Sequence, residues 1–347
     1  MQQIHTALCS FGMSGKVFHA PFIHVHPGFR LQAVWERSKS VVKDFYPDVV
    51  SYTNYETLLK DPEVELVVIN TPNYTHYDFT KAALLAGKHV IVEKPFTVTS
   101  AEGEELLDLA RLQQRLLTVY HNRRWDSDFK TISKVLEEGW LGEVVEVEIH
   151  FDRYRLDLSP KQHKENPGPG TGALYDLGSH LIDQALMLFG MPEAVFADLQ
   201  TLRPESQVDD YFEVLLYYPQ LRVRLHSSYL VREALPGYIL HGTKGSFIKH
   251  RTDIQETALQ AGKKPGTADW GVEPGEEQGF LHAEKDGQVI REKIISERGD
   301  YMDYYDGVYA AIREGAPPPV PAIDGLNVIR IIEAAFKSSN ERRVVEL

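Results

Sequence analysis

Lys94 is the side chain best placed by the sequence to exchange a proton with a substrate. It follows the apolar run His89–Val92 directly, in the string Glu93-Lys94-Pro95. Desolvation after such a run lowers the pKa of a lysine toward the range of general acid–base catalysis. Pro95 restricts the backbone of Lys94 to an extended conformation, which holds the side chain in place. The alternative is that Lys94 extends along the surface with its ammonium group in water.

A polar stripe on a later helix is the second candidate for chemistry. The segment from Asp176 to Phe189 is predicted to be helical. His180, Asp183 and Gln184 follow Asp176 by four, seven and eight residues. They therefore share one face. The rest of the helix is apolar and so expected to be buried, where carboxylates are costly unless they are paired or face a wet cavity. We expect the stripe to line a site. The alternative is that Asp176 and His180 form a structural pair that caps the helix.

A metal at this stripe is the third possibility, because a histidine and a carboxylate one helical turn apart can share an ion. No second histidine falls at ligand spacing within this helix. A dehydrogenase that uses a nicotinamide and a lysine acid–base does not require a metal. We therefore predict no metal site.

A glycine-containing loop follows the first apolar run, Ile4–Cys9. It reads Ser10-Phe11-Gly12-Met13-Ser14-Gly15, which is the G-x-G-x-x-G pattern with Ser10 at the first position. Glycines there let the backbone approach a pyrophosphate, whose charge is bound by N–H groups at the start of the following helix. The pattern favours a dinucleotide cofactor. Turns before helices are also rich in glycine and serine for conformational reasons alone.

The cofactor choice depends on Glu36-Arg37-Ser38-Lys39, which ends the second apolar run. A carboxylate at this position accepts hydrogen bonds from a free ribose 2′-hydroxyl and repels a 2′-phosphate. Arg37 and Ser38 would instead bind that phosphate. We predict NADP, with NAD possible, provided that Glu36 turns toward solvent or Lys39. A solvated helix start is the structural alternative for all four residues.

The composition sets the class of protein. With 347 residues, the chain is long enough for two domains. The net charge of -13 opposes binding to nucleic acid or to an acidic membrane surface. Cys9 is the single cysteine, and no apolar run is long enough to span a bilayer. We expect a cytoplasmic protein whose ligand is a small molecule.

The elements that must position these residues fall into two patterns. Up to residue 122, apolar runs that read as strands alternate with helical segments, which predicts a doubly wound parallel sheet of the Rossmann type. These strands are predicted at Ile4–Cys9, Leu31–Trp35, Leu66–Ile69, His89–Val92 and Leu116–Tyr120, with helices at Asp78–Ala86 and Ser100–Leu112. In 123–347, consecutive strands predict a second, mostly antiparallel, open-faced α+β domain. Its strands are predicted at Val144–Phe151, Phe212–Tyr218, Leu221–Tyr229 and Tyr238–His241, with helices at Tyr301–Arg313 and Leu326–Ser338 covering one face and a surface loop at Gly262–Gly279.

Taken together, these motifs resemble the glucose-fructose oxidoreductase/inositol dehydrogenase (Gfo/Idh/MocA) family along the whole chain. The resemblance is carried by Gly12 and Gly15, Thr71-Pro72-Asn73-Tyr74-Thr75-His76, Glu93-Lys94-Pro95 and the stripe from Asp176 to Asp183. The strings Phe18-His19-Ala20-Pro21, His121-Asn122-Arg123-Arg124-Trp125-Asp126 and Asp176-Leu177-Gly178-Ser179-His180 look like its scyllo-inositol 2-dehydrogenase branch, chiefly the members that use NADP. Ser10 and Glu36 depart from the pattern of that branch.

The resemblance implies a catalytic group of Lys94, Asp176 and His180. It also implies a cofactor site and a substrate site, the latter formed by the catalytic group with Asn122 and Asp183. The cofactor site takes in Gly12, Met13, Ser14, Gly15, Glu36, Arg37, Ser38, Thr71, Pro72, Asn73, His76, Glu93 and Lys94. The expected activity is hydride transfer between NAD(P) and a hydroxyl-bearing ring carbon of a polyol or sugar, in a homodimer or homotetramer assembled through the C-terminal sheet. The alternative function is a catalytically silent NAD(P) sensor on the same fold.

Overall fold

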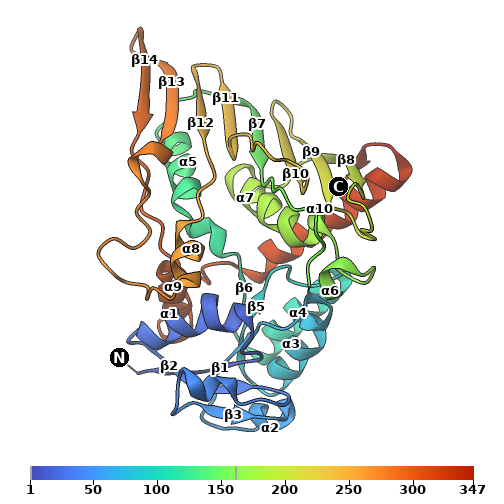
Figure 1. Ribbon diagram of the computed structural model, residues 1–347, viewed down its shortest axis with the longest axis vertical. Helices are drawn as coiled ribbons and strands as arrows, with labels where there is room; N and C mark the ends of the chain where they lie inside the picture. The colour runs from blue at the N-terminus through green and yellow to red at the C-terminus, as the bar shows by residue number, and fades with distance from the viewer. Residues whose placement is uncertain (1, 161) are drawn as a thin grey trace. The chain divides into compact units, whose positions relative to one another are not determined.

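The apolar runs of the first third of the chain form a six-stranded parallel sheet (Figure 1). The strand order β3-β2-β1-β4-β5-β6 is that of the Rossmann fold. The computed structural model describes residues 2–160 and 162–347. The strands are β1 (Ile4–Leu8), β2 (Phe29–Trp35), β3 (Val50–Tyr52), β4 (Leu66–Ile69), β5 (His89–Glu93) and β6 (Leu117–Tyr120). Every residue of β4 is buried, as expected for a strand covered on both faces. The predicted fold of this part is confirmed, and β3 is an additional strand at the edge.

Side chains cap the start of two helices of this region, at Asn54 and Thr99. The helices are α1 (Ala20–Val25), α2 (Tyr55–Leu59), α3 (His76–Leu85) and α4 (Ser100–Gln113). Before α4, Thr99 Oγ1 accepts the N–H of Glu102 at 3.3 Å, and the Glu102 carboxylate accepts the N–H of Thr99 at 3.1 Å. This reciprocal capping box fixes the start of α4. It also fixes the far end of the loop that begins at Lys94.

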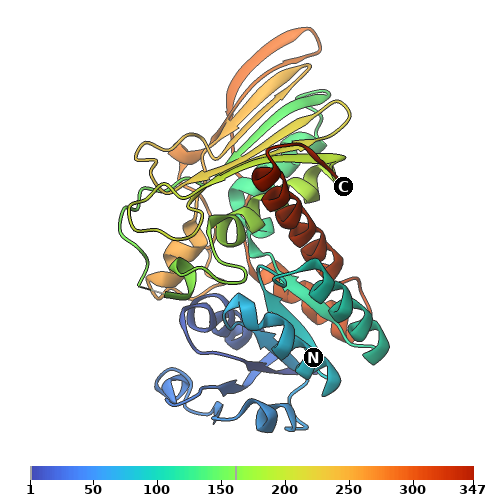
Figure 2. The ribbon, with the colours of Figure 1, turned by 90° about the vertical axis from the view of Figure 1, so that its right-hand side faces the viewer.

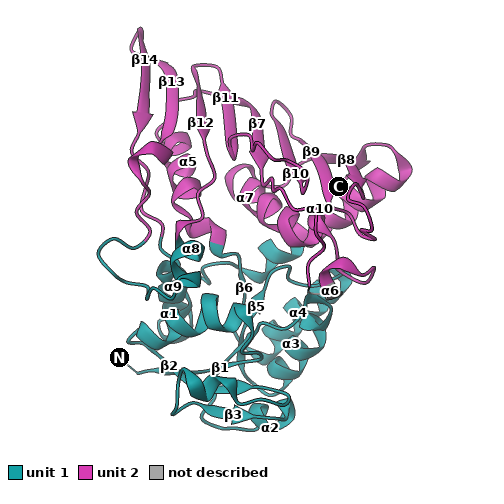
Figure 3. Cartoon of the chain, in the orientation of Figure 1, with its two compact units in different colours: residues 1–122, 255–270, 300–326 teal, residues 123–254, 271–299, 327–347 magenta. Residues whose placement is uncertain are grey.

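The chain divides into two units that do not follow its sequence order (Figure 3). Unit 1 comprises residues 1–122, 255–270 and 300–326, and unit 2 comprises 123–254, 271–299 and 327–347. We expected all of 123–347 to form the second domain. The chain instead returns to the Rossmann unit twice, through α8 (Ile254–Gln260) and α9 (Met302–Arg313), and α10 (Ala322–Glu341) crosses the last boundary.

Helix α9 corrects a second expectation, because it does not cover the C-terminal sheet. Its buried tyrosines pack within unit 1: Tyr305 stacks on Phe22 of α1 at 5.7 Å between ring centroids, and Tyr304 contacts Thr118 of β6 at 3.3 Å between hydroxyls. His26 adds an ion pair of 2.8 Å with Asp306. Aromatic burial of this size dominates local packing, so the Rossmann unit holds this helix.

Unit 2 is built on a nine-stranded sheet in the order β14-β13-β12-β11-β7-β10-β9-β8-β15. All neighbouring strands are antiparallel except β7 and β10, which run parallel. The predicted mostly antiparallel sheet is therefore confirmed. The strands are β7 (Val144–His150), β8 (Ala194–Gln200), β9 (Tyr211–Tyr217), β10 (Arg222–Ser228), β11 (Tyr238–Gly242), β12 (Gly245–Lys249), β13 (Gly279–Lys285), β14 (Gln288–Ile294) and β15 (Val345–Glu346).

One face of this sheet is covered and the other is open. In β9, Phe212, Val214 and Leu216 are fully buried, whereas the residues between them are partly exposed. This alternation is that of a sheet with one face packed on a core. The helices of unit 2 are α5 (Ser127–Glu137), α6 (Gln162–Glu165) and α7 (Ser179–Phe189), together with most of α10, which lies beside the strands in Figure 2. Ser338 of α10 accepts the N–H of Ala197 in β8 at 2.9 Å.

Among the described residues, no helix is both long and apolar enough to cross a lipid bilayer.

We expected Gly262–Gly279 to be a surface loop, but only part of this segment is exposed. Trp270 is buried, and the side chain of Glu273 is 1% exposed in an ion pair with Lys249, which is 0% exposed (Nζ to Oε2, 2.6 Å). The hydroxyl groups of Thr252 and Ser296 also donate to this carboxylate, at 2.5 and 2.6 Å. Burial would raise the pKa of Glu273, but these hydrogen bonds, with that of Lys249 first, hold it below its ordinary value.

We predict that Lys249→Met lowers the free energy of unfolding by about 3 to 5 kcal/mol, because it leaves a buried carboxylate unpaired. Denaturant unfolding at pH 7 measures this loss, and the double variant Lys249→Met/Glu273→Gln should recover part of it. Since the folded-state pKa of Glu273 is depressed, its contribution is present above the unfolded pKa of about 4.3 and is lost as the pH falls further. The difference between wild type and Lys249→Met should therefore shrink below about pH 4. A difference that does not change with pH would contradict this account.

Candidate active site

The cofactor loop lies where β1 ends and the first helical turn begins. Ser10, at the first position of the glycine pattern, accepts the N–H of Gly12 with its Oγ at 3.1 Å. The helix that follows the loop contains a π-helical turn over Gly15–His19. A Cβ on Gly15 would lie 2.3 Å from the Ser10 carbonyl oxygen and 3.0 Å from Nδ2 of Asn70. Only glycine permits this close backbone approach, which suits a loop that cradles a pyrophosphate.

Glu93 connects this loop to the end of β5. Its Oε1 accepts a hydrogen bond from the hydroxyl of Ser14 and lies 3.0 Å from Nε2 of His19. Nδ1 of His19 in turn lies 2.8 Å from the hydroxyl of Tyr305. Burial alone would raise the pKa of Glu93, but the contacts with His19, Ser14 and Lys94 more than offset it and lower the pKa to about 2. Glu93 is therefore a carboxylate at neutral pH, and it holds the cofactor loop.

The carboxylate of Glu36 is held by contacts within its own unit. Its carboxylate accepts the N–H groups of Val41 and Val42, at 2.9 and 3.3 Å, and the hydroxyl of Ser51, at 3.0 Å. It thus binds the start of a short 3₁₀ turn over Val41–Asp44. We expected Glu36 to point toward solvent or Lys39 if it left the cofactor site. The structure gives it backbone donors instead.

Arg37 and Ser38 follow Glu36 and are exposed at the carboxyl end of β2. Arg37 makes no hydrogen bond or ion pair with any described residue, so its guanidinium is available to an anion. β2 neighbours β1 in the sheet, and ligands of doubly wound folds bind beyond the carboxyl ends of such strands.

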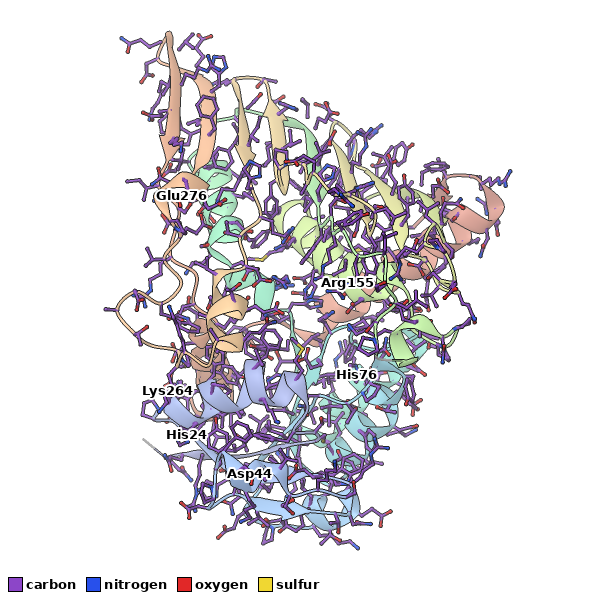
Figure 4. The ribbon with its side chains drawn as sticks, in the orientation of Figure 1. His24, Asp44, His76, Arg155, Lys264 and Glu276 are labelled. Carbon is purple, nitrogen blue, oxygen red and sulfur yellow. The ribbon has the colours of Figure 1, made fainter. Side chains whose placement is uncertain are left out.

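The segment from Thr71 to His76 follows β4, at the same carboxyl end of the parallel strands. Asn73 begins a 3₁₀ turn, and Thr75 Oγ1 donates to the Pro72 carbonyl at 2.6 Å. His76, at the start of α3 (Figure 4), lies 2.8 Å from the Pro95 carbonyl oxygen and 3.0 Å from that of Thr71. Carbonyl oxygens only accept, so a neutral ring donates to one of them at a time. Burial lowers the pKa of His76. The residue ties the loop after β4 to the loop after β5.

Lys94 leaves the sheet at the same edge. It directly follows β5 and is half-buried, and its peptide bond to Pro95 is cis. The carboxylate of Glu93 adjoins it and interacts with its charge. A shallow depression at the opposite, amino end of β1 contains none of the predicted site residues and is lined by Gln2, Gln3, His5, Pro27, Pro62, Glu63 and Glu65.

The second predicted group lies in unit 2, around the start of α7. Asp176 belongs to a π-helical turn over Leu174–Gly178, and His180 and Asp183 follow in α7. Asp176 pairs with Lys164, with Nζ 2.8 Å from Oδ2, and is partly exposed, whereas His180 is buried. Both oxygens of Asp183 bind Arg124, at 2.9 and 2.6 Å.

The partners of these side chains affect the role that we predicted for Asp183. The bidentate Arg124–Asp183 pair is fully buried in protein, which gives Asp183 a structural function whether or not it also meets a substrate. Gln184 likewise bonds inward, accepting the hydroxyl of Tyr238 at 3.1 Å. Lys94 and the buried Asn122 belong to unit 1, while Asp176, His180 and Asp183 belong to unit 2. The catalytic group of Lys94, Asp176 and His180 and the substrate contacts stay predictions.

Several residues that shape the site were not identified from the sequence. They are Asn70, which donates to the Ser10 carbonyl at 2.9 Å, and the partners His19, Tyr305, Lys164 and Arg124. Each partner is far along the chain from the residue it contacts, so no local spacing signals the pair. The one available clue was the burial of polar residues such as His19 in an apolar helix start.

We predict that Gly15→Ala lowers the melting temperature of the cofactor-free protein and weakens NADP binding about tenfold or more, equal to roughly 1.4 kcal/mol. The added methyl would overlap the Ser10 carbonyl and displace the loop. Gly12→Ala is the matched control, because its methyl would lie 3.4 Å from Ser10 Oγ, an ordinary contact. Thermal melts without cofactor and titration with NADP measure both effects. Equal melting temperatures for the two variants would contradict the role of the Gly15 contact.

Two family models match the chain. The model described as the oxidoreductase family, NAD-binding Rossmann fold, matches residues 4–121, and that described as the oxidoreductase family, C-terminal alpha/beta domain, matches residues 133–347. The first shows that unit 1 contains an NAD(P)-binding domain.

Relatives and solved structures match over almost the whole length. The chain is 42% identical to scyllo-inositol 2-dehydrogenase (NADP(+)) IolW of Bacillus subtilis, over 99% of this chain and 96% of that protein. It is 41% identical to the uncharacterized oxidoreductase YdgJ of Escherichia coli, over 98% and 97%. The crystal structure of an oxidoreductase of Bacteroides fragilis superposes with a TM-score of 0.92 at 47% identity and covers 100% of both chains. The oxidoreductase yvaA of Bacillus subtilis gives a TM-score of 0.95 at 42% identity, over 100% of this chain and 99% of that one. With both of its domains matched and relatives of this identity along its whole length, the chain belongs to the Gfo/Idh/MocA family of oxidoreductases.

Proposed function

We propose that the chain is an NADP-dependent dehydrogenase that moves a hydride between the nicotinamide and a hydroxyl-bearing ring carbon of a polyol or sugar, as a scyllo-inositol-type 2-dehydrogenase. The observation that carries this proposal is the Glu93 contact with the cofactor loop. The residue before Lys94 contacts the loop that would cradle the pyrophosphate, and this supports a position for Lys94 beside the nicotinamide. The 42% identity to the NADP-dependent enzyme IolW supports the substrate class.

The cradle at Gly15 fits a dinucleotide, because any side chain there would fill the space that the backbone needs. Bound NADP would supply the hydride acceptor at nicotinamide C4 in the oxidative direction. Lys94 or His180 takes the proton of the reacting hydroxyl, so that the carbinol becomes a carbonyl. Asp176 orients His180, and Lys164 holds Asp176 through an ion pair of 2.8 Å. The proton acceptor and the hydride acceptor are then separate groups, as general base catalysis requires.

The preference for NADP follows from where Glu36 is bound. A carboxylate that already accepts hydrogen bonds from Val41, Val42 and Ser51 is not offered to a ribose 2′-hydroxyl. These donors stabilise the charged form of Glu36, so its negative charge stays beside the position of a 2′-phosphate and Arg37 would have to offset it. Arg37 and Ser38 are exposed beside it and can bind the phosphate in the bidentate geometry that arginine favours.

Assembly into a homodimer or homotetramer through the open face of the unit 2 sheet is part of this proposal. Phe196 of β8 and Ile248 of β12 point from that face and are 39% and 37% exposed. Light scattering on the eluting protein gives the mass of the assembly, and a monomer would contradict this part.

A panel of inositols, inososes and aldoses, followed by absorbance at 340 nm with NADP and NAD, tests the function as a whole. A catalytically silent NAD(P) sensor would bind the cofactor and leave the absorbance unchanged with every substrate. Reduction of NADP with a polyol would exclude that alternative.

We predict that Lys94→Ala lowers turnover by a factor of about 10² or more, while NADP affinity stays within a few fold, because the lysine acts on the reacting hydroxyl. Lys94→Arg should be nearly as poor, since a guanidinium does not release a proton near neutral pH. Lys60→Ala, at an exposed lysine of the same unit, is the control. Steady-state kinetics with the best substrate of the panel measures all three. An active Lys94→Arg would mean that only the charge of Lys94 matters.

We predict that Arg37→Ala weakens NADP binding by about 1.5 to 3 kcal/mol, or ten- to a hundredfold, and leaves NAD binding unchanged, because only NADP carries the 2′-phosphate. The matched control is Arg30→Ala, an exposed arginine at the amino end of the same strand. Titration of both cofactors into the three proteins decides the preference. If wild type prefers NAD and Glu36→Ala abolishes that preference, Glu36 is the ribose ligand and the assignment to NADP is wrong.

A further inference from the structure

A cluster of two histidines and an aspartate lies on the sheet of unit 2, outside the predicted catalytic group. His150 ends β7, Asp152 follows it, and His226 lies in β10. The two strands are parallel, and their register sets His150 opposite His226, with 5.2 Å between ring centroids. Residues at every second position of a strand share a face, so these side chains point away from Ile149 and Leu225, which are fully buried in the core. One ligand atom from each of the three lies within 4.8 Å of the others.

Hydrogen bonds around the cluster leave two acceptor atoms facing each other. Nε2 of His150 lies 3.0 Å from the Glu148 carboxylate, and Oδ1 of Asp152 accepts from Ser228 N–H at 3.1 Å and contacts Nδ1 of His226 at 3.0 Å. Nδ1 of His150 and Oδ2 of Asp152 then remain 3.5 Å apart, and neither has a hydrogen-bond partner among the described residues. Both side chains are nearly buried, 5% and 2% exposed.

The chemistry of these atoms requires a positive charge between them. A carboxylate only accepts, so Glu148 fixes the proton of a neutral His150 on Nε2 and leaves a lone pair on Nδ1. That lone pair faces those of Asp152 Oδ2, and such a contact is unfavourable in a buried setting unless a proton or a metal cation lies between the two atoms. A histidine whose other nitrogen donates to a carboxylate is the common arrangement of metal ligands in proteins.

We propose that His150, Asp152 and His226 form a binding site for a divalent transition metal of the zinc class. Two imidazoles and one carboxylate are a ligand set that zinc uses, and a fourth, tetrahedral position remains for water. Zinc–nitrogen bonds of about 2.0 to 2.1 Å place tetrahedral ligand atoms roughly 3.3 Å apart, so the cluster needs only side-chain rotation to close. The ion replaces the contact between His226 and Asp152 Oδ1.

The surrounding charges favour a cation. Glu148 and Glu213 add two carboxylates, and both are paired with Arg224, at 2.9 and 3.1 Å, so this arginine faces the acids rather than the ligand atoms. Tyr211 packs edge-on against His226 at 5.3 Å between ring centroids and covers its flank. Arg153 and Arg251 lie over the ring of Phe151, which points to the other face of the strand.

This site goes beyond the proposed function. From the sequence we predicted no metal site, on an argument made at the Asp176–His180 helix, and this proposal departs from that prediction at a different cluster. Hydride transfer itself needs no metal. A metal at this cluster would bridge β7 and β10, the one parallel pair of the sheet, and act on the stability of unit 2.

Titration of zinc chloride into the full-length, EDTA-treated and desalted protein tests the proposal by calorimetry. We expect one zinc per chain, with affinity reduced about 100-fold or more in Asp152→Asn and His226→Gln, since each removes a ligand, and about tenfold in Glu148→Gln, which removes an outer partner. His282→Gln, at an exposed histidine of β13, is the matched control and should bind as wild type does. His226 is partly exposed, so His226→Gln is the variant that least disturbs folding, and thermal melts without zinc check this.

A rise in melting temperature on adding zinc, seen in wild type and in His282→Gln but not in His226→Gln, would support the same site. Absence of saturable zinc binding in wild type would overturn the proposal and leave a proton on His150 as the charge between the two atoms. Binding that is unchanged in both His226→Gln and Asp152→Asn would overturn it as well, because the zinc would then lie elsewhere.

Discussion

The carboxylate of Glu93 is the constraint on which the organisation of the cofactor edge depends. A single oxygen, Oε1, contacts Ser14 of the cofactor loop and His19 of the first helical turn, and His19 reaches Tyr305 of α9. Because these contacts hold the pKa of Glu93 at about 2, the negative charge persists at any pH at which the protein is studied. Three segments that are distant in sequence are thereby joined: the loop and first turn from Ser14 to His19, the end of β5 at Glu93, and α9 at Tyr305. This also explains why the chain returns to the Rossmann unit to deliver α9, since without Tyr305 the ring of His19 would lose its second contact.

Much of the fold could be predicted because local patterns of apolar residues specify it. Buried parallel strands such as Leu66–Ile69 are uniformly apolar, and their position in the sequence identifies the Rossmann unit. The hairpin of β13 and β14 was missed although Asp286-Gly287, both with positive φ, form the tight turn that favours it. β14 is polar and lies at the edge of the sheet, and in β13 the alternation is carried by the small residues Gly279 and Ala283 beside Leu281, so the apolar signal of both strands is weak. The placement of α9 depends on which unit buries its tyrosines, which no local pattern specifies.

The residue types of the candidate site could be predicted, but not their partners. Asp176 and Asp183 were selected because a carboxylate in apolar surroundings needs a partner or a wet cavity, and Glu93 was selected through the family resemblance. The partners are Lys164, Arg124 and His19, which lie 12, 59 and 74 residues away along the chain. Local periodicity reports only on neighbours within a strand or a helical turn. Partners brought together by the fold therefore had to come from the structure.

The choice of cofactor at Glu36 also depends on contacts that the sequence pattern does not report. An acid at the end of the second strand is an argument for NAD only if its oxygens are available to the ribose. That availability depends on local backbone donors, and here the turn after Ser40 supplies two N–H groups while Ser51 supplies a hydroxyl. Each bond to a charged carboxylate stabilises by about 1.5 to 3 kcal/mol, comparable to one ribose contact, so a cofactor would have to displace several such bonds to recruit Glu36. Glu36 therefore holds the turn after Ser40 in place, and its use by a cofactor depends on the competition between these donors and the ribose as well as on the identity of the acid. The preference for NADP that we propose rests on this competition.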